Sequence, residues 1–167
     1  RAHLAQLREA QAARDRAWAN PVSVVVDASA GTGKTWLLVQ RALWFVLGRG
    51  VRMRRMVMLA FTEKAAREMG TRLAVSLQRV LAAPSRDLLP EEVVPMAGDL
   101  SLAALQERAR TALDEFQHAH ISTIHSFAGD ILRLHAAEAG VDPAFKVDEG
   151  PEFAGLVASE WDRFVVR

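Results

Sequence analysis

Along the chain, short continuous apolar runs alternate with segments in which apolar residues recur at helical spacing. Short apolar runs, rich in β-branched and aliphatic side chains, cover residues 22–26 and 56–61. Such runs are typical of strands buried on both faces of a parallel sheet. Each run precedes a segment with apolar residues at helical spacing, 37–46 after the first and 65–77 after the second. The alternation of strands with helices predicts an α/β fold with a parallel sheet.

Capping and breaking residues predict where the first elements end. Residues 4–19 form an expected helix that Asn20-Pro21 ends, and Gly48 is expected to cap the helix after the first strand. Thr62 is expected to cap a helix that runs to about Ala82.

The remaining segments are assigned in the same way. Residues 49–55 form a basic connector, and residues 83–99, with three prolines and no periodicity, predict a surface loop that is the least ordered part. Ser101 is expected to cap a helix to about Phe116. A strand at 121–124, a helix at 126–139 that stops at Gly140, and a helix from 151 to 167 complete the expected elements.

Composition narrows the classes of protein that the chain can represent. A formal net charge of +1 argues against nucleic-acid binding through bulk positive charge, so any DNA contact must be local. The absence of cysteine excludes disulfides and thiolate metal sites. Because the chain lacks an apolar run of about 18 residues and its start is polar, we expect a soluble cytoplasmic protein without a signal peptide or membrane contact.

The segment between the first strand and its helix carries the clearest chemistry. Its residues are Ala28, Ser29, Ala30, Gly31, Thr32, Gly33, Lys34 and Thr35, which meet the phosphate-loop pattern G-x-x-x-x-G-K-[ST] except that Ala replaces the first Gly. Small residues let backbone N–H groups surround a phosphate, and Lys34 and Thr35 supply a cation and a Mg²⁺-binding hydroxyl. The alternative is a chance glycine-rich turn before a helix.

Three segments in order resemble motifs of UvrD-like superfamily 1 DNA helicases: ASAGTGKTW (28–36), LAFTEKAAREM (59–69) and ISTIHSF (121–127). Within that superfamily the chain is most similar to the RecB and AddA recombination helicase–nucleases. The resemblance implies a P-loop NTPase (RecA-like) parallel sheet flanked by helices and incomplete at its C-terminal end. Residues 1–150 would be the first part of that domain, and residues 151–167 the start of a helical insertion.

The resemblance also implies an ATP and Mg²⁺ site. Lys34 and Thr35 become candidate catalytic residues, with the Thr35 hydroxyl as the Mg²⁺ ligand, and the segment from Ala28 to Trp36 becomes the nucleotide-binding loop. Members of the family carry an upstream glutamine that binds adenine. Gln11 lies at about the right distance, and Gln6 is a second possibility.

The second and third segments imply contacts to single-stranded DNA by Phe61, Thr62, Thr123, His125 and Ser126. Ala60 departs from the Thr that is usual in the family, which removes one possible hydroxyl contact. A core aromatic is the alternative for Phe61. A metal site at His118, His120 and His125 would lack acidic or cysteine partners at ligand spacing. The arginines at 49, 52, 54 and 55 could steer DNA, but a charged connector between strand and helix is the commoner explanation.

The expected acidic hydrolysis motif, an apolar strand ending in Asp-Glu, is absent. Asp114-Glu115 follows a helical pattern, and Asp148-Glu149 lies in a polar segment. We therefore expect an inactive N-terminal fragment of an ATP-dependent DNA helicase or translocase for double-strand-break repair and recombination, nucleoid-associated and bound to a partner helicase–nuclease subunit. The alternatives are a non-hydrolysing nucleotide- or DNA-binding module and a P-loop kinase of small substrates.

Overall fold

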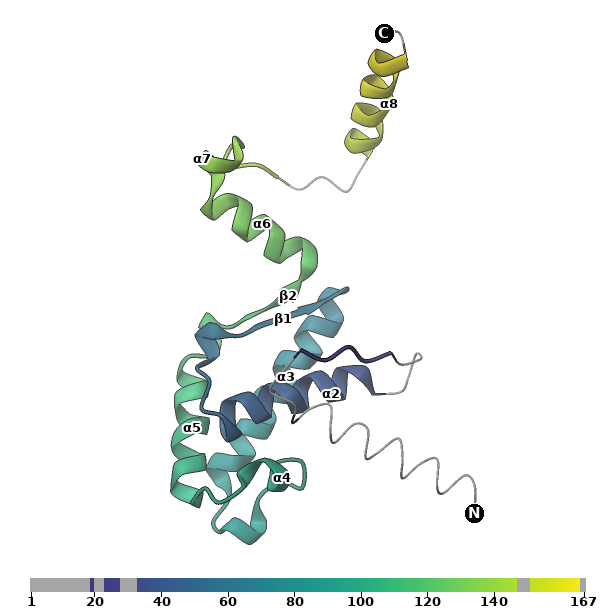
Figure 1. Ribbon diagram of the computed structural model, residues 1–167. Coiled ribbons are helices and arrows are strands. Elements are labelled where there is room, and N and C mark those ends of the chain that lie inside the picture. Colours follow the sequence, from purple (N-terminus) through teal and green to yellow (C-terminus); the bar gives the residue numbers. More distant parts are fainter. Residues whose placement is uncertain (1–18, 20–22, 28–32, 147–150, 166–167) are drawn as a thin grey trace, which may run out of the picture. The chain divides into compact units, whose positions relative to one another are not determined.

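The computed structural model describes residues 19, 23–27, 33–146 and 151–165 (Figure 1). The chain groups into two compact units, Arg1–Ile124 and His125–Arg167, and each is described by itself. The helices and strands of the first unit are, in order, α2 (Lys34–Leu43), the π-helix η1 (Trp44–Gly48), the 3₁₀ helix η2 (Met53–Arg55), β1 (Val57–Ala60), α3 (Glu63–Ala82), η3 (Arg86–Leu88), α4 (Val94–Ala97), α5 (Leu102–Asp114), η4 (Phe116–His118) and β2 (His120–Thr123).

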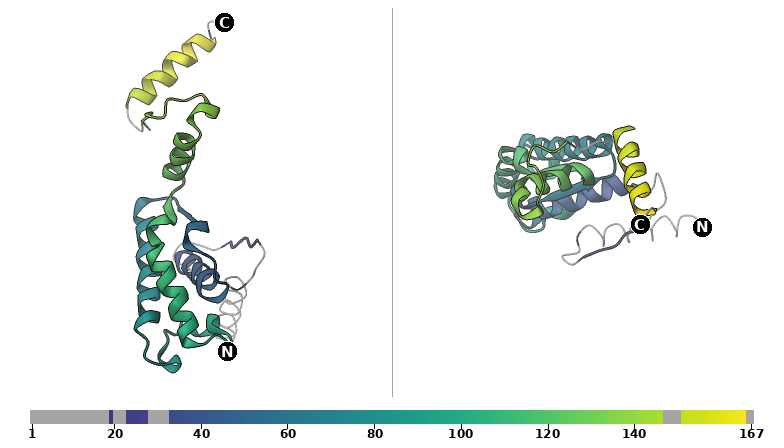
Figure 2. Two further views of the ribbon diagram at one scale, coloured as in Figure 1. Left: turned by 90° about the vertical axis from the view of Figure 1, so that its left-hand side faces the viewer. Right: turned by 90° about the horizontal axis from the view of Figure 1, so that it is seen from above.

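The two strands of the first unit pair in parallel, as the α/β pattern predicts. Val57 lies opposite His120 and Ala60 lies opposite Thr123. Helix α3 packs against both strands and also against α2 and α5, and Figure 2 shows α3 and α5 side by side. The described residues thus form a mixed helical unit with a two-stranded parallel sheet, which is consistent with the α/β class.

The strand predicted at residues 22–26 is wrong for the part that the structure describes. Residues 23–27 have no regular secondary structure, and Val25 and Val26 are 97% and 44% exposed. A strand is buried on both faces only when neighbouring strands and helices enclose it. The described sheet consists of β1 and β2 alone, so residues 23–27 pair with no described strand.

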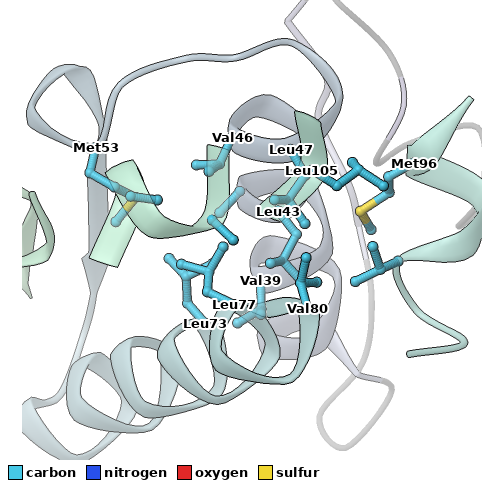
Figure 3. Close-up of a cluster of buried hydrophobic side chains, with 14 of the residues drawn as sticks. Val39, Leu43, Val46, Leu47, Met53, Leu73, Leu77, Val80, Met96 and Leu105 are labelled. Carbon is cyan, nitrogen blue, oxygen red and sulfur yellow. The ribbon is translucent and has the colours of Figure 1, made fainter. Parts of the chain in front are cut away.

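The hydrophobic core lies between α2, η1, α3 and α5 (Figure 3). Its largest side chains are almost completely removed from solvent, and they include Leu43, Leu47, Met53, Leu73, Leu77 and Leu105. The apolar stripes predicted at residues 37–46 and 65–77 therefore face each other, the first on α2 and η1 and the second on α3. Burial of each such side chain contributes about 1.5–3 kcal/mol to the free energy of unfolding.

Side chains satisfy the ends of several helices. The predicted caps are confirmed, since Thr62 Oγ1 accepts from Ala65 N–H at 3.2 Å and Ser101 Oγ accepts from Ala104 N–H at 3.2 Å. Helix α5 also supplies Gln106, which donates to the carbonyl oxygens of Leu81 and Ala83 at the end of α3. These carbonyls lack partners within their own helix. The bonds from Gln106 therefore satisfy the end of α3 and also connect α3 to α5.

The structure corrects the role predicted for Gly48. This residue is the last of the π-helix rather than a left-handed cap, and Gly50 takes the positive φ of 68°. A Cβ atom at Gly48 would lie 3.1 Å from Cδ1 of Trp44 and 3.3 Å from the carbonyl oxygen of Met96. A side chain at position 48 would therefore crowd Trp44 and the backbone of α4.

The segment at residues 83–99 is not the poorly ordered loop that its composition predicts. It contains η3 and α4, and Leu89, Val93, Met96 and Ala97 are buried in the core. Glu92 accepts hydrogen bonds from Ser76 at 3.2 Å and from Arg79 at 3.1 Å. The helical pieces are too short to produce a periodic pattern, so sequence analysis missed their burial.

The second unit holds α6 (Ile124–Leu134, beginning at the last residue of the first unit), α7 (Ala136–Ala139) and α8 (Pro151–Val165). The predicted single helix at 126–139 is interrupted at His135, while Gly140 ends α7 with a φ of 66°, as predicted. The predicted helix after residue 150 is confirmed as α8. No described helix combines the length and the apolar character that crossing a membrane requires.

Candidate functional site

The amino-terminal end of α2 contains the last residues of the predicted phosphate loop. Gly33 has a φ of 90°, a left-handed conformation that glycine adopts without strain, and its carbonyl accepts from Leu37 N–H at 3.0 Å. Lys34 and Thr35 are the first two residues of the helix, with Lys34 exposed and Thr35 partly buried. The side chain of Trp36 packs against the core and holds this turn in place.

The first turn of α2 has the electrostatic character of an anion site. No acidic residue lies in this turn, and no described side chain caps it. Its backbone N–H groups and the positive end of the helix dipole favour a negatively charged group. Gln11 and the segment from Ala28 to Thr32 lie outside the described residues.

The candidate metal ligands of this site suit magnesium better than a metal that protein side chains alone coordinate. The described residues include no group of three or more His, Cys, Asp or Glu side chains that could hold a metal ion. Mg²⁺ usually keeps several water and phosphate ligands and takes only one or two from the protein. The Thr35 hydroxyl, beside a helix end that favours phosphate, suits such a metal.

A cleft of about 230 Å³ lies between residues 23–27 and α2. Lys34 and Arg41 line it together with apolar side chains, namely Val24, Val26, Leu37 and Leu38. Apolar walls with a few cationic groups suit an organic anion.

The carboxyl end of β1 presents an exposed aromatic ring. Phe61 follows the strand directly and is 83% exposed, so the interpretation of Phe61 as a core aromatic is wrong. Thr62 is also exposed, and its hydroxyl oxygen already caps α3. An uncovered ring beside the positive end of a 20-residue helix can stack on a flat group while a neighbouring anion is stabilised.

The other predicted DNA-binding residues lie at or after the end of β2. Thr123 pairs with Ala60 in the sheet but is only 7% exposed, which leaves little side-chain surface for a DNA contact. His125 and Ser126 are exposed at the start of α6, in the second unit. The first unit therefore brings Phe61, Thr62 and Thr123 to one edge of the sheet, with Phe61 the most accessible of the three.

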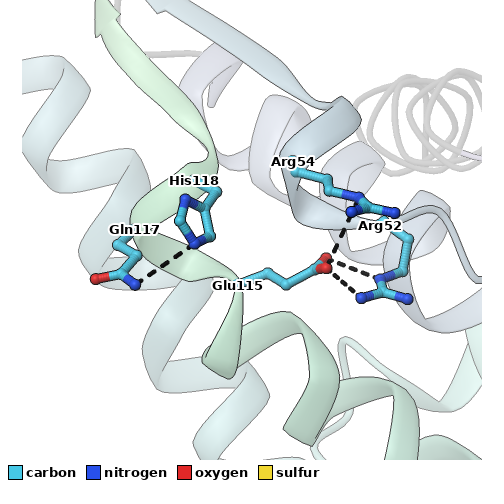
Figure 4. Close-up of polar contacts among 5 residues, drawn as sticks. All are labelled: Arg52, Arg54, Glu115, Gln117 and His118. Carbon is cyan, nitrogen blue, oxygen red and sulfur yellow. Dashed lines mark hydrogen bonds and ion pairs between the residues drawn. The ribbon is translucent and has the colours of Figure 1, made fainter.

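The opposite edge holds an ion-pair cluster that sequence analysis did not identify (Figure 4). Arg52 donates to both carboxylate oxygens of Glu115, with 2.9 Å between Nε and Oε2, and Arg54 Nε lies 3.9 Å from Oε1. The hydrogen bonds from Arg52 hold the pKa of Glu115 below its usual value, and those bonds raise the pKa of Arg52. Two arginines of the basic connector thus have a structural role.

A larger cleft of about 370 Å³ lies at this edge, between the connector and α5. Its lining includes Arg52 and Glu115, which already satisfy each other. The volume alone does not make it the site, because the phosphate-loop residues and Phe61 lie elsewhere.

Comparisons with known proteins identify the family. The model of the UvrD/REP helicase N-terminal domain matches residues 8–162. The chain is 36% identical over 134 residues to the AddA subunit of an ATP-dependent helicase/nuclease from Pelotomaculum thermopropionicum, covering 78% of the chain and 9% of that protein. The protein of the same name from Anoxybacillus flavithermus is 33% identical over 134 residues, covering 79% of the chain and 10% of that protein.

A third AddA protein, from Ligilactobacillus salivarius, is 31% identical over 144 residues, which cover 84% of the chain and 10% of that protein. The chain therefore spans about a tenth of the length of the curated relatives it matches. Because the family model matches nearly the whole chain, the chain belongs to the UvrD/REP helicase N-terminal domain family and is similar to the AddA helicase/nuclease proteins within it.

Proposed function

We propose that this chain forms the ATP-binding and DNA-contacting start of an ATP-driven translocase on single-stranded DNA, used in double-strand-break repair and recombination. The observation that carries the proposal is the ring of Phe61, 83% exposed at the carboxyl end of β1. The ring follows the end of the strand directly and lies beside the amino-terminal end of α3, where it is accessible to stack on a base whose phosphate the helix end would stabilise. The curated relatives are named as parts of ATP-dependent helicase/nucleases, which supports this choice.

The nucleotide half of the proposal rests on α2. The Lys34 ammonium would contact the β- and γ-phosphates of ATP, and the Thr35 hydroxyl would hold Mg²⁺, which neutralises charge on the transferred phosphate. The segment from Ala28 to Gly33 would donate backbone N–H groups to the phosphates, with Trp36 behind it, and Gln11 would bind the adenine. The left-handed Gly33 and the absence of acidic residues from the first turn of α2 support this arrangement.

The DNA half rests on the carboxyl end of the sheet. Phe61 would stack on a base, the Thr62 hydroxyl would donate to a phosphate while its oxygen caps α3, and His125 and Ser126 would donate to further phosphates. Thr123, which is buried, would hold the end of β2 beside Ala60. ATP-dependent movement would follow if both sites bias one conformational equilibrium of the motor.

Other parts of the motor belong to the same proposal. The sequence shows no apolar run, of the kind expected for a strand, that ends in Asp-Glu, so we assign water activation and the arginine finger to other parts of a longer helicase. Residues 1–150 would form the first part of the RecA-like domain and residues 151–167 the opening of a helical insertion. The full-length protein would act in the cytoplasm at the nucleoid, with a partner helicase–nuclease subunit.

The test is a titration of the full-length protein with a fluorescent ATP analogue in the presence of Mg²⁺. Lys34→Ala should weaken binding by about 10- to 150-fold, because a hydrogen bond to a charged group contributes about 1.5–3 kcal/mol. The matched control is Lys146→Ala, which removes an exposed lysine of the second unit and should leave binding unchanged. Ordinary nucleotide affinity in Lys34→Ala would contradict the assigned phosphate site.

A further inference from the structure

The ion pair between Arg52 and Glu115 is in register with the sheet. Both residues precede their strands as the first flanking residue of a single-turn 3₁₀ helix, Arg52 before η2 and Glu115 before η4. They are separated by 63 residues, which is also the separation of every pair from Val57↔His120 to Ala60↔Thr123. The ion pair therefore joins two side chains at the same sequence offset as the paired strand residues, before the amino ends of the two strands.

The strands themselves define their register weakly. Each has four residues, and β1 (VMLA) is apolar at every position. A slip by one residue turns every side chain to the other face of the sheet, but in an all-apolar strand such a slip exchanges one apolar side chain for another. The face of the sheet that carries Val57 does little to oppose such a slip, because Val57 is already 50% exposed.

The ion pair distinguishes the native register from a slipped one, which the side chains of the strands do not. The guanidinium of Arg52 meets the carboxylate of Glu115 through two N–H groups, a planar geometry that a displaced partner cannot reproduce. The Glu115 side chain is 13% exposed beside Arg52, so a slip would leave a partly buried carboxylate without its partner. Of the groups that face this carboxylate, Arg54 and His118 are also basic and add to its stabilisation.

We propose that Arg52 and Glu115 are positioning residues that fix the register of β1 against β2 and so place Phe61 and Thr62 for single-stranded DNA. This inference rests on the proposed function for its DNA part only. Phe61 and Thr62 follow β1 directly, so any shift of β1 along β2 moves both residues relative to the end of β2.

Register can be measured with cysteine pairs, since residues 1–167 contain no cysteine. Any cysteines elsewhere in the full-length protein are first replaced by serine. In the full-length protein, Val57→Cys with His120→Cys reports the native pairing, and Val57→Cys with Ile121→Cys reports a one-residue slip. Oxidation should cross-link only the first pair in the parent. Arg52→Glu should lower that yield and raise the second, and adding Glu115→Arg should restore the parent pattern.

Two further variants guard against simple unfolding. Arg52→Lys keeps the charge but loses the paired N–H geometry, so it should show an intermediate cross-linking pattern in a folded protein. Arg55→Glu reverses an exposed charge in the same 3₁₀ helix, where Arg55 forms no ion pair with any described residue, and should leave the cross-links unchanged. Cross-linking of the native pair at the parent yield in both folded Arg52 variants would overturn the register assignment.

The DNA part is tested by titrating a fluorescent oligothymidylate at fixed salt into full-length variants that lack the introduced cysteine pairs. Arg52→Glu should weaken binding about tenfold, the loss expected when one stacked base is misplaced, and the exchange with Glu115→Arg should restore it. Arg55→Glu should change affinity by less than about threefold, as expected for one screened surface charge. Restored cross-links without restored DNA binding would overturn the placing of Phe61.

The same titration separates the two proposals. If Phe61→Ala leaves binding at the parent level, the proposed DNA function of this edge fails, while the cross-links still decide the role of Arg52 and Glu115. If Phe61→Ala weakens binding and Arg52→Glu does not, the proposed function stands and the positioning role is overturned.

Discussion

Replacing Phe61 by alanine separates a DNA-binding residue from a core residue by two independent measurements. The residue is 83% exposed, so less than a fifth of its surface is buried in the folded protein. A Phe61→Ala substitution should therefore alter DNA affinity strongly and the free energy of unfolding very little. A core phenylalanine would show the reverse.

The expected magnitudes follow from that exposure. Complete burial of such a side chain contributes about 1.5–3 kcal/mol, so the buried part of Phe61 contributes about 0.3–0.5 kcal/mol to the free energy of unfolding. Truncation of a fully buried phenylalanine would instead cost about 3–5 kcal/mol. Loss of one stacked base should cost about 1–3 kcal/mol of binding free energy, or about 5- to 150-fold in the dissociation constant.

The assay combines urea denaturation with oligonucleotide binding at several salt concentrations. Stacking releases no counterions, so the slope of the logarithm of affinity against the logarithm of salt concentration should be the same in Phe61→Ala and the parent. Leu88→Ala removes another exposed apolar side chain, 65% exposed in η3, and should change neither measurement. A large loss of stability with unaltered DNA binding would refute the reasoning.

Three further predictions concern the fold that supports the site. Met96→Ala should lower the free energy of unfolding by about 2–5 kcal/mol because Met96 is buried, whereas Val94→Ala, at a 54% exposed position, should change it by less than about 0.5 kcal/mol in urea denaturation. Gly48→Val should destabilise the protein by about 1–3 kcal/mol, because its side chain meets Trp44 and the Met96 carbonyl; an unchanged melting temperature would contradict the close approach. Glu115→Gln should abolish a stabilisation that is present above about pH 4.5 and is lost as pH falls through the lowered pKa of Glu115. The melting temperatures of parent and variant should therefore converge in acid. A constant difference down to pH 3 would contradict the lowered pKa.

Local signals in the sequence predicted those features that depend on neighbouring residues. Thr62 and Ser101 were identified as helix caps because a hydroxyl before a helix has a partner three residues later, and both bonds are present. Gly140 was identified as a helix end for a similar reason, and its positive φ confirms it. The parallel direction of the described strands also followed from the alternation of elements, whereas the alternation did not predict which strands pair.

Features that depend on distant residues were predicted less well. Val93 lies directly before the four-residue helix α4 and Met96 lies within it, and so short a helix gives no periodic pattern. The burial of these two residues in the core therefore could not be predicted. The pairing of Arg52 with Glu115 joins residues 63 positions apart, and neither residue differs in the sequence from an ordinary surface charge. Phe61 shows the same limit at the site, since only the structure separates an exposed ring from a core aromatic.

The central claim, that one edge of this domain binds DNA while α2 binds the nucleotide that drives movement, is tested most directly by ATP hydrolysis. Steady-state hydrolysis by the full-length protein should be measured against oligonucleotide concentration for the parent, Phe61→Ala and Lys34→Ala. The account predicts that DNA stimulates the parent, that Phe61→Ala needs about 5- to 150-fold more DNA for half-maximal stimulation, and that Lys34→Ala is inactive at every DNA concentration. Hydrolysis that is independent of single-stranded DNA, or that survives Lys34→Ala, would contradict it.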